Sequence, residues 1–191
     1  MNRVADVLIA GTGLVLASPF LGLAALATKL EDRGPVLYRQ ARVGKGGEDF
    51  DVLKLRSMVV DAENLGAGWA VDEGDARITR VGRILRRTSL DELPQLWNVL
   101  RGDMSIIGPR PTLRYQVEQY DDHQFRRLDV RPGLTGWAQV HGRASLPWAE
   151  RIELDVWYVD HRSPRVDLAI LLRTPLALFR GTYRGTTGGW R

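Results

Sequence analysis

The sequence predicts an α+β fold that is mainly helical, and three observations support this prediction. No charged residue occurs between Val7 and Thr28, which favours a long apolar helix at the start of the chain. Two short, partly apolar segments, 36–43 and 50–55, flank a glycine-rich turn and favour a small β-hairpin. Within 89–100, leucine and tryptophan recur at helical spacing on one face.

Length and composition indicate one catalytic domain preceded by a membrane element. With 191 residues and 44% hydrophobic content, the chain can bury one sizeable core. We therefore expect residues 1–30 to form a membrane helix and residues 31–191 to form the catalytic domain. The net charge of +4 suits anionic partners such as nucleotides, phospholipid headgroups or nucleic acid. The absence of cysteine excludes disulfides and thiolate metal sites, and the three histidines fit no common zinc spacing.

The apolar opening has three interpretations. At about 1.5 Å per residue it is long enough to span a hydrocarbon core of about 30 Å. Ser18 and Pro19 lie near its middle, and proline predicts a kink or break there because it removes a backbone donor. The segment is then a kinked spanning helix or a re-entrant helix that returns to its own side. The third interpretation is a secretory signal, with 25–27 as its cleavage site.

Basic residues at both ends of the opening favour the same membrane side for each end. Arg3 precedes the apolar segment, and Lys29 and Arg33 follow it. Cytosolic flanks of membrane segments carry an excess of Lys and Arg. The flanking charge therefore agrees with the re-entrant interpretation, although it leaves the spanning one open.

The remaining elements follow from periodicity and from the placement of glycine and proline. The final apolar segment, 166–179, is too short and too charged to span a membrane, and fits an amphipathic helix at the membrane interface. The other expected elements are a short helix and then a mobile loop over 61–75, helices over 78–87, 89–100, 112–129 and 148–161, and a loop over 131–136.

Adjacent carboxylates, Asp91 and Glu92, are the candidate catalytic pair. Ser89 with Glu92 also fits a helix capping box, a purely structural explanation. That explanation leaves Asp91 without a role. Near a helix N-terminus, Asp91 is expected to stay ionised, and an ionised aspartate that reaches phosphorus is a plausible nucleophile. A carboxylate beside phosphate oxygens also suits Mg²⁺, so Asp91 is the predicted metal ligand.

Three arginines are candidate phosphate ligands around this pair. Arg86 precedes the carboxylates, and Arg110 follows them between two prolines, which limit its backbone freedom and lower the ordering cost of a guanidinium–phosphate contact. Arg143 follows the glycine-containing loop and could supply a further contact.

Several blocks, taken together, resemble the bacterial sugar transferase family, the monotopic phosphoglycosyl transferases. The matching blocks run nearly from end to end of the chain, and the chain is similar to the minimal catalytic form of the family. Two departures are histidine at 141, where the family often has asparagine, and Lys-Leu-Arg-Ser-Met at 54–58 in place of Lys-Phe-Lys-Thr-Met. The blocks are the apolar opening with Ser18-Pro19, KLRSM at 54–58, SLDELPQLWNVLRGDMSIIGPRP at 89–111, RPGLTGWAQVHGR at 131–143 and ELDVWYV at 153–159.

The resemblance implies a reaction. Such enzymes move a sugar-1-phosphate from a UDP-sugar to a polyprenol phosphate, usually undecaprenyl phosphate, and release UMP. By similarity, Asp91 attacks the β-phosphorus with Mg²⁺ bound, Glu92 assists transfer to the lipid phosphate, and Arg86, Arg110 and Arg143 hold phosphates. Ser18 and Pro19 would then break a re-entrant helix.

The resemblance also implies a place and partners. The enzyme would act on the cytosolic face of the bacterial inner membrane, in exopolysaccharide, O-antigen (lipopolysaccharide) or glycoprotein glycan assembly. Its partners would be the UDP-sugar, the polyprenol phosphate, membrane lipids and other glycan-assembly enzymes, with no nucleic acid.

Two alternatives remain open from the residues. One is a Mg²⁺-dependent hydrolase of lipid-linked or nucleotide diphosphates, which needs no lipid acceptor. The other is a membrane-anchored basic scaffold in which the carboxylates only cap a helix. The sequence does not reveal the sugar, the pathway or the oligomeric state, nor the roles of His141 and of the glycine-rich tail over 181–191.

Overall fold

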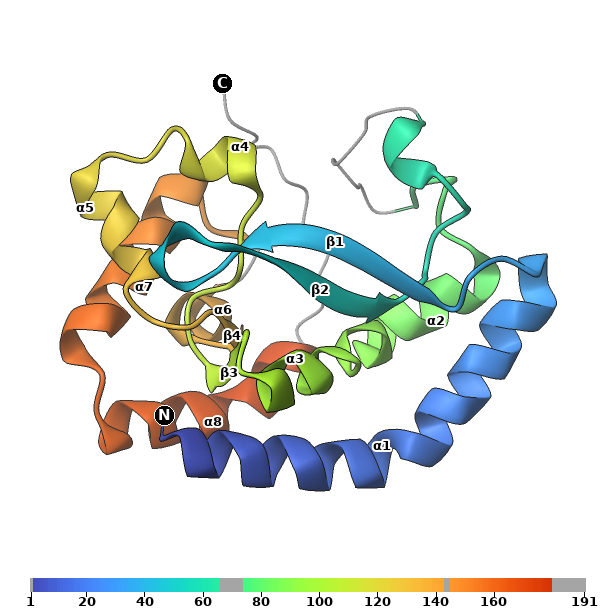
Figure 1. Cartoon of the computed structure of the whole chain (residues 1–191), viewed down its shortest axis with the longest axis horizontal. Helices are drawn as coiled ribbons and strands as arrows, with labels where there is room; N and C mark the ends of the chain where they lie inside the picture. Colours follow the sequence, from blue (N-terminus) through green and yellow to red (C-terminus); the bar gives the residue numbers. More distant parts are fainter. Residues whose placement is uncertain (1, 66–73, 143–144, 180–191) are drawn as a thin grey trace.

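The computed structural model describes residues 2–65, 74–142 and 145–179, and its fold is mainly helical with a small β-hairpin (Figure 1). The mainly helical prediction and the hairpin are therefore confirmed. The α-helices are α1 (Arg3–Asp32), α2 (Arg80–Thr88), α3 (Gln95–Arg101), α4 (Arg114–Val117), α5 (Asp122–Phe125), α6 (Trp137–His141), α7 (Trp148–His161) and α8 (Pro164–Phe179). The strands are β1 (Leu37–Val43), β2 (Asp49–Leu55), β3 (Ser105–Ile107) and β4 (Gly133–Thr135), and the short 3₁₀ turns are η1 (Lys45–Gly47), η2 (Ala62–Asn64), η3 (Leu90–Glu92) and η4 (Arg126–Leu128).

Helix α1 is long, apolar and bent. Within the described residues it is the one helix whose length and composition suffice to cross a membrane, and 11% of its most apolar window is buried. Pro19 lies inside it, and the ribbon changes direction in its middle part (Figure 1). The Ser18 hydroxyl donates to the carbonyl of Val15 at 2.8 Å, the acceptor that Pro19 leaves without its usual donor. The predicted kink is confirmed, but a full break at Ser18–Pro19 is wrong because the helix continues to Asp32.

The N-terminal end of α1 is bound to the catalytic domain. The Arg3 guanidinium donates to the carbonyl of Leu100 at 2.7 Å and so satisfies a carbonyl in the last turn of α3. The buried carboxylate of Asp6 accepts from the Ser105 hydroxyl at 2.9 Å and from the Ile106 amide at 2.8 Å. The first turns of α1 are therefore fixed to α3 and β3.

The C-terminal end of α1 is bound to the same domain. Asp32 forms an ion pair with Arg56, just after β2. Glu31 accepts from the Arg80 amide at 2.7 Å, so it satisfies a free N–H at the start of α2. Both ends of the apolar helix thus contact one body, and Figure 1 shows α1 running beneath α3 and then along α2.

The hairpin and α3 form the framework behind the site. Strands β1 and β2 pair antiparallel from Leu37↔Leu55 to Val43↔Asp49, as predicted. Asn98, fully buried on α3, accepts from the Leu53 amide at 3.0 Å and donates to the Asp51 carbonyl at 2.7 Å. These bonds join α3 to β2 and so fix the segment that carries the carboxylates relative to the hairpin. The central core cluster consists of Ala10, Leu96, Val99, Met104, Ile106, Ile107, Tyr158 and Ile170.

A parallel pair, β3 with β4, was not predicted. Each strand has only three residues, so neither gives a readable alternation in sequence. Their backbones approach closely at Gly108, Gly133 and Gly136, where an added Cβ would lie 2.0 to 2.3 Å from main-chain atoms. Glycine is therefore required at these positions because a larger side chain would not fit, not because the backbone adopts an unusual dihedral angle.

Two predicted helices differ from the structure. The helix expected over 89–100 is divided: η3 ends at Glu92 and α3 begins at Gln95, because Pro94 has no N–H for the intervening bond. The helix expected over 112–129 consists of α4, α5 and η4, since Asp121 caps a new helix by accepting from the Gln124 amide. Helices α2, α7 and α8 agree with the predictions, whereas 66–73 of the expected loop lie outside the described residues.

Candidate active site

A tight turn brings the carboxylate pair beside the hairpin. Ser89 adopts a left-handed conformation (φ 56°) that ends α2, and η3 follows directly with Asp91 and Glu92 in its first turn. The Ser89 side chain makes no capping bond, and the side chain of Glu92 pairs elsewhere. The capping-box interpretation is therefore wrong, and both carboxylates need another explanation.

Glu92 is held by two cations. Its carboxylate lies 3.5 Å from Lys54 Nζ on β2 and pairs with the guanidinium of Arg110. The Glu92 and Lys54 side chains are about one-fifth exposed, whereas Arg110 is nearly half exposed. Burial lowers the pKa of Lys54, and the Glu92 charge opposes that shift. Glu92 therefore links the hairpin to the Pro-Arg-Pro turn.

Asp91 is the more deeply buried carboxylate, with 7% of its surface exposed. Within the described part of the chain, no group donates a hydrogen bond to it. Burial, together with the charge of Glu92, raises the pKa of Asp91 to about 6, although Lys54, Arg86 and Arg110 act in the opposite direction. The expectation of a helix N-terminus that favours ionisation is wrong, because Asp91 lies in a short 3₁₀ turn. Asp91 is nevertheless mainly ionised at neutral pH.

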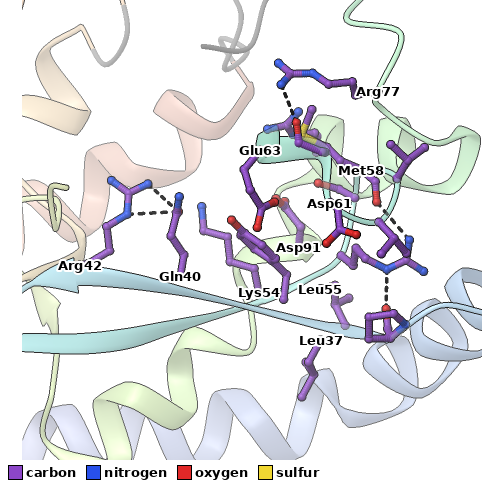
Figure 2. A pocket seen from close by; sticks show the side chains of 18 residues that line it. Leu37, Gln40, Arg42, Lys54, Leu55, Met58, Asp61, Glu63, Arg77 and Asp91 are labelled. Atoms are coloured by element: carbon purple, nitrogen blue, oxygen red, sulfur yellow. Dashed lines mark hydrogen bonds between the residues drawn. The ribbon is translucent and has the colours of Figure 1, made fainter. Parts of the chain in front are cut away.

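A cavity of about 270 Å³ opens beside Asp91. Figure 2 shows Arg42, Gln40 and Lys54 on one side, Asp61 and Met58 on the other, and Asp91 between them. The Gln40 side chain accepts two hydrogen bonds from Arg42, which keeps that guanidinium oriented along β1. The cavity therefore combines one buried carboxylate with several cationic side chains, as a phosphorylated ligand requires.

The structure brings four of the five predicted site residues together. Arg86, on α2, lines the cavity with Asp91, and Arg110 contacts the neighbouring Glu92. Arg143, the remaining candidate, lies outside the described residues.

The site suits a hard divalent cation to a limited degree. No group of three or more His, Asp or Glu side chains that could hold a metal occurs in residues 2–65, 74–142 and 145–179. Mg²⁺, however, often takes only one or two protein carboxylates and completes its shell with phosphate and water. The carboxylate of Asp91, which receives no hydrogen bond from the residues that the structure describes, fits that requirement. Mg²⁺ is therefore compatible with these residues only when a phosphate ligand is also present.

Comparison with known sequences decides the family. The model of the family described as bacterial sugar transferase matches residues 1–181. The chain belongs to the bacterial sugar transferase family.

Some relatives within the bacterial sugar transferase family are named for related reactions, and others for a role in exopolysaccharide production. The chain is 48% identical over 185 residues to a UDP-glucose:undecaprenyl-phosphate glucose-1-phosphate transferase of Caulobacter vibrioides, covering 91% of this chain and 67% of that protein. It is 44% identical over 188 residues to a UDP-N-acetylgalactosamine-undecaprenyl-phosphate N-acetylgalactosaminephosphotransferase of Aeromonas hydrophila, covering 95% and 44%. An exopolysaccharide production protein, ExoY, of Rhizobium meliloti is 38% identical over 198 residues, covering 95% and 88%. The chain thus spans less than half of the Aeromonas protein. Together with α1, these names indicate a membrane-associated transferase.

Sequence reasoning undervalued two residues of this bacterial sugar transferase. Lys54 stands in a block that departs from the family pattern, yet it contacts Glu92 and lines the cavity. Asp91's burial was also not foreseen. His141, whose role the sequence left open, lies against Trp137 with its ring tilted by 47° and accepts from Arg173 at 3.1 Å, so it joins α6 to α8.

Proposed function

We propose that this protein transfers a sugar-1-phosphate from a UDP-sugar to a polyprenol phosphate, undecaprenyl phosphate, and releases UMP through a covalent intermediate on Asp91. The observation that carries the proposal is a buried carboxylate that receives no hydrogen bond from the described residues and faces a cavity with several cationic side chains. The names of the relatives support the same class of reaction. The pathway would be the first membrane step of exopolysaccharide or related glycan assembly.

Asp91 would act as the nucleophile. Its oxygen attacks the β-phosphorus of the UDP-sugar, and the bond between that phosphorus and the oxygen bridging to the α-phosphorus breaks, so UMP leaves. An oxygen of the polyprenol phosphate then attacks the same phosphorus and displaces the Asp91 carboxylate. A nucleophile without hydrogen bonds to its oxygens keeps its lone pairs available, and burial removes the water that would otherwise solvate it.

The neighbouring charges would bind and orient phosphate. The charges of Arg86 and Arg110 both lower the pKa of Asp91, so both groups act electrostatically on it. Glu92 would orient Arg110 and assist transfer to the lipid phosphate. Arg143 is proposed as a further phosphate ligand from the family resemblance. When bound with the diphosphate, Mg²⁺ would supply charge neutralisation beside Asp91.

The contacts of α1 support a re-entrant arrangement. Arg3 and Asp6 attach the first turns to the catalytic domain, and Glu31 and Asp32 attach the last turns to it. A helix whose two ends are bound to one water-exposed body does not place them on opposite sides of a bilayer. We propose that α1 enters the cytosolic leaflet of the inner membrane and returns to the same side.

Labelling tests this arrangement directly. The chain has no cysteine, so a single cysteine placed at Asn2 or at Arg33 is the sole thiol. In intact cells, both thiols should be protected from a reagent that does not enter the cytosol. Reaction of one thiol but not the other would eliminate the re-entrant arrangement.

One assay tests the reaction itself. The purified protein is incubated with Mg²⁺, undecaprenyl phosphate and a panel of UDP-sugars, and UMP is measured. Intact mass without the acceptor should show the protein with a sugar-phosphate adduct on Asp91, and that adduct should be absent in Asp91→Asn. Product release independent of undecaprenyl phosphate would favour a hydrolase, and turnover in Asp91→Asn would refute the nucleophile.

The scaffold alternative receives no support from the site geometry. It required the carboxylates to cap a helix, and neither does so. A buried carboxylate without a capping role lowers the stability of the fold, so a structural purpose does not account for it.

A further inference from the structure

We propose that the buried ion pair between Arg127 and Asp155 positions Arg110, the guanidinium that contacts Glu92. The inference rests on the proposed phosphate-binding role of Arg110. Arg127 lies in η4 and Asp155 on α7, and neither contacts the cavity beside Asp91. Both would therefore be positioning residues, which act through the turn that carries Arg110.

The turn at 109–111 is held by its carbonyl groups. The two prolines have no N–H, so the turn has few donors of its own. The Pro109 carbonyl accepts from the Gly133 amide at 2.8 Å. The Pro111 carbonyl accepts from Arg42 at 3.4 Å. Each of these bonds comes from a different part of the chain, and each fixes one flank of Arg110.

The Arg110 carbonyl itself accepts from Arg127. The distance from Arg127 Nη2 is 3.0 Å. The same nitrogen contacts Asp155 Oδ2, and the other terminal nitrogen donates to the Tyr120 hydroxyl at 2.5 Å. The ring of Trp148 lies 5.7 Å from the guanidinium carbon. The planar guanidinium of Arg127, on η4, thus connects the 109–111 turn to Tyr120, which follows α4, and to Asp155 on α7.

The geometry of the pair favours positioning over a purely stabilising role. Both side chains are 3% exposed, and burying two charges costs several kcal/mol per ion before their attraction is counted. A pair arranged for its own stability would use two parallel bonds. Here the Arg127 Nε and the Asp155 Oδ1 have no hydrogen-bond partner within the described residues. The guanidinium is instead turned so that it reaches the Arg110 carbonyl.

The test replaces the pair with apolar residues of similar volume. Arg127→Met with Asp155→Leu removes both charges together, a change that often leaves stability unaltered or raised. The full-length protein is purified in detergent and studied by thermal unfolding, by UMP release and by calorimetric binding of inorganic pyrophosphate. We expect an unchanged or higher midpoint, kcat/KM for the UDP-sugar about ten-fold lower and a pyrophosphate Kd about ten-fold higher, because Arg110 loses its orientation.

A matched control is available on the same elements. Arg126 and Asp160 also form an ion pair between η4 and α7, but both are exposed and neither contacts the 109–111 turn. Arg126→Met with Asp160→Leu should leave kinetics and pyrophosphate affinity within two-fold of the wild type. An equal loss in this control would overturn the inference, because the effect would then follow from the α7 attachment in general.

Non-additivity with Arg110 separates positioning from structure. In an Arg110→Met background the guanidinium is already absent, so replacing Arg127 and Asp155 should change kcat/KM by less than two-fold. A full further loss in that background would overturn the inference, as would wild-type kinetics and affinity in the folded pair variant. If the pair variant does not fold, Arg127→Lys replaces it. Lysine keeps the charge opposite Asp155 but has no planar fork to reach both oxygens, and the same two outcomes apply.

The two proposals fail in different ways. A wild type that binds pyrophosphate but releases no UMP from any UDP-sugar refutes the proposed reaction, and pyrophosphate affinity in the variants then decides the inference. A wild type that binds no pyrophosphate refutes the phosphate-binding role of Arg110 and with it the inference.

Discussion

Replacing Asp91 by asparagine should stabilise the protein while it abolishes the proposed reaction. The pKa of Asp91 is raised from 3.8 to about 6, mainly by burial. The unfolded chain therefore loses this proton at lower pH than the folded chain does. The stability contribution falls as pH rises from about 4 to about 6 and stays low above that range, by about 3 kcal/mol in total. Asparagine carries no charge and does not incur this cost.

The measurement compares thermal unfolding at two pH values. At pH 7.5 the Asp91→Asn variant should unfold about 6 to 12 °C above the wild type, since 1 kcal/mol corresponds to about 2 to 4 °C in a chain of this size. At pH 4 the difference should largely disappear. Glu118→Gln removes a charge from an exposed side chain and should change the midpoint by little at either pH.

The result that contradicts this reasoning is specific. An Asp91→Asn variant that is equally stable or less stable at pH 7.5, while it keeps its fold, would mean that Asp91 is not a desolvated carboxylate. The electrostatic properties of the cavity beside Asp91 would then not depend on that charge. A stabilised variant that still releases UMP would instead support the conclusion that Asp91 is a desolvated carboxylate, and would refute its role as the nucleophile.

Other perturbations have outcomes set by single contacts. In the proposed reaction, kcat/KM should fall about ten-fold per pH unit below about 6, as Asp91 becomes protonated; a flat profile to pH 5 would contradict this. Gly82→Ala would place a Cβ 1.9 Å from the Ser57 carbonyl oxygen and should destabilise the fold by about 2 kcal/mol or more, as measured by denaturant unfolding. Gly11→Ala, which meets nothing within 4 Å, is its control and should be neutral or stabilising by up to about 1 kcal/mol. Asp6→Ala leaves two buried donors of β3 without an acceptor and should cost about 2 to 4 kcal/mol; an unchanged midpoint would show that those donors find other partners.

Local chemistry made much of this fold predictable. Glycines between two partly apolar segments predicted the β1–β2 hairpin, and Pro19 predicted the bend in α1. The bounds of α7 matched the expectation because prolines flank it, with Pro147 directly before its first residue and Pro164 three residues after its last. In each case the signal lies within the element or next to it.

Contacts between distant segments were not readable in the same way. The residue that pairs with Glu92 from the hairpin, Lys54, lies 38 positions away, and no local pattern marks it. Ser89 with Glu92 fits a capping box by spacing, but the left-handed turn at Ser89 and the attraction of Arg110 place Glu92 elsewhere. Burial of Asp91 depends on packing of the hairpin against η3, which periodicity does not describe.

The attachment of α1 has a consequence for biosynthesis. The groups that receive Arg3 and Asp6 lie 96 to 100 residues further along the chain. When the apolar helix leaves the ribosome, neither charged side chain has its partner, because those residues have not yet been translated. The nascent helix therefore meets the lipid first, and its contacts with the enzyme form only after residues 99 to 106 have been translated.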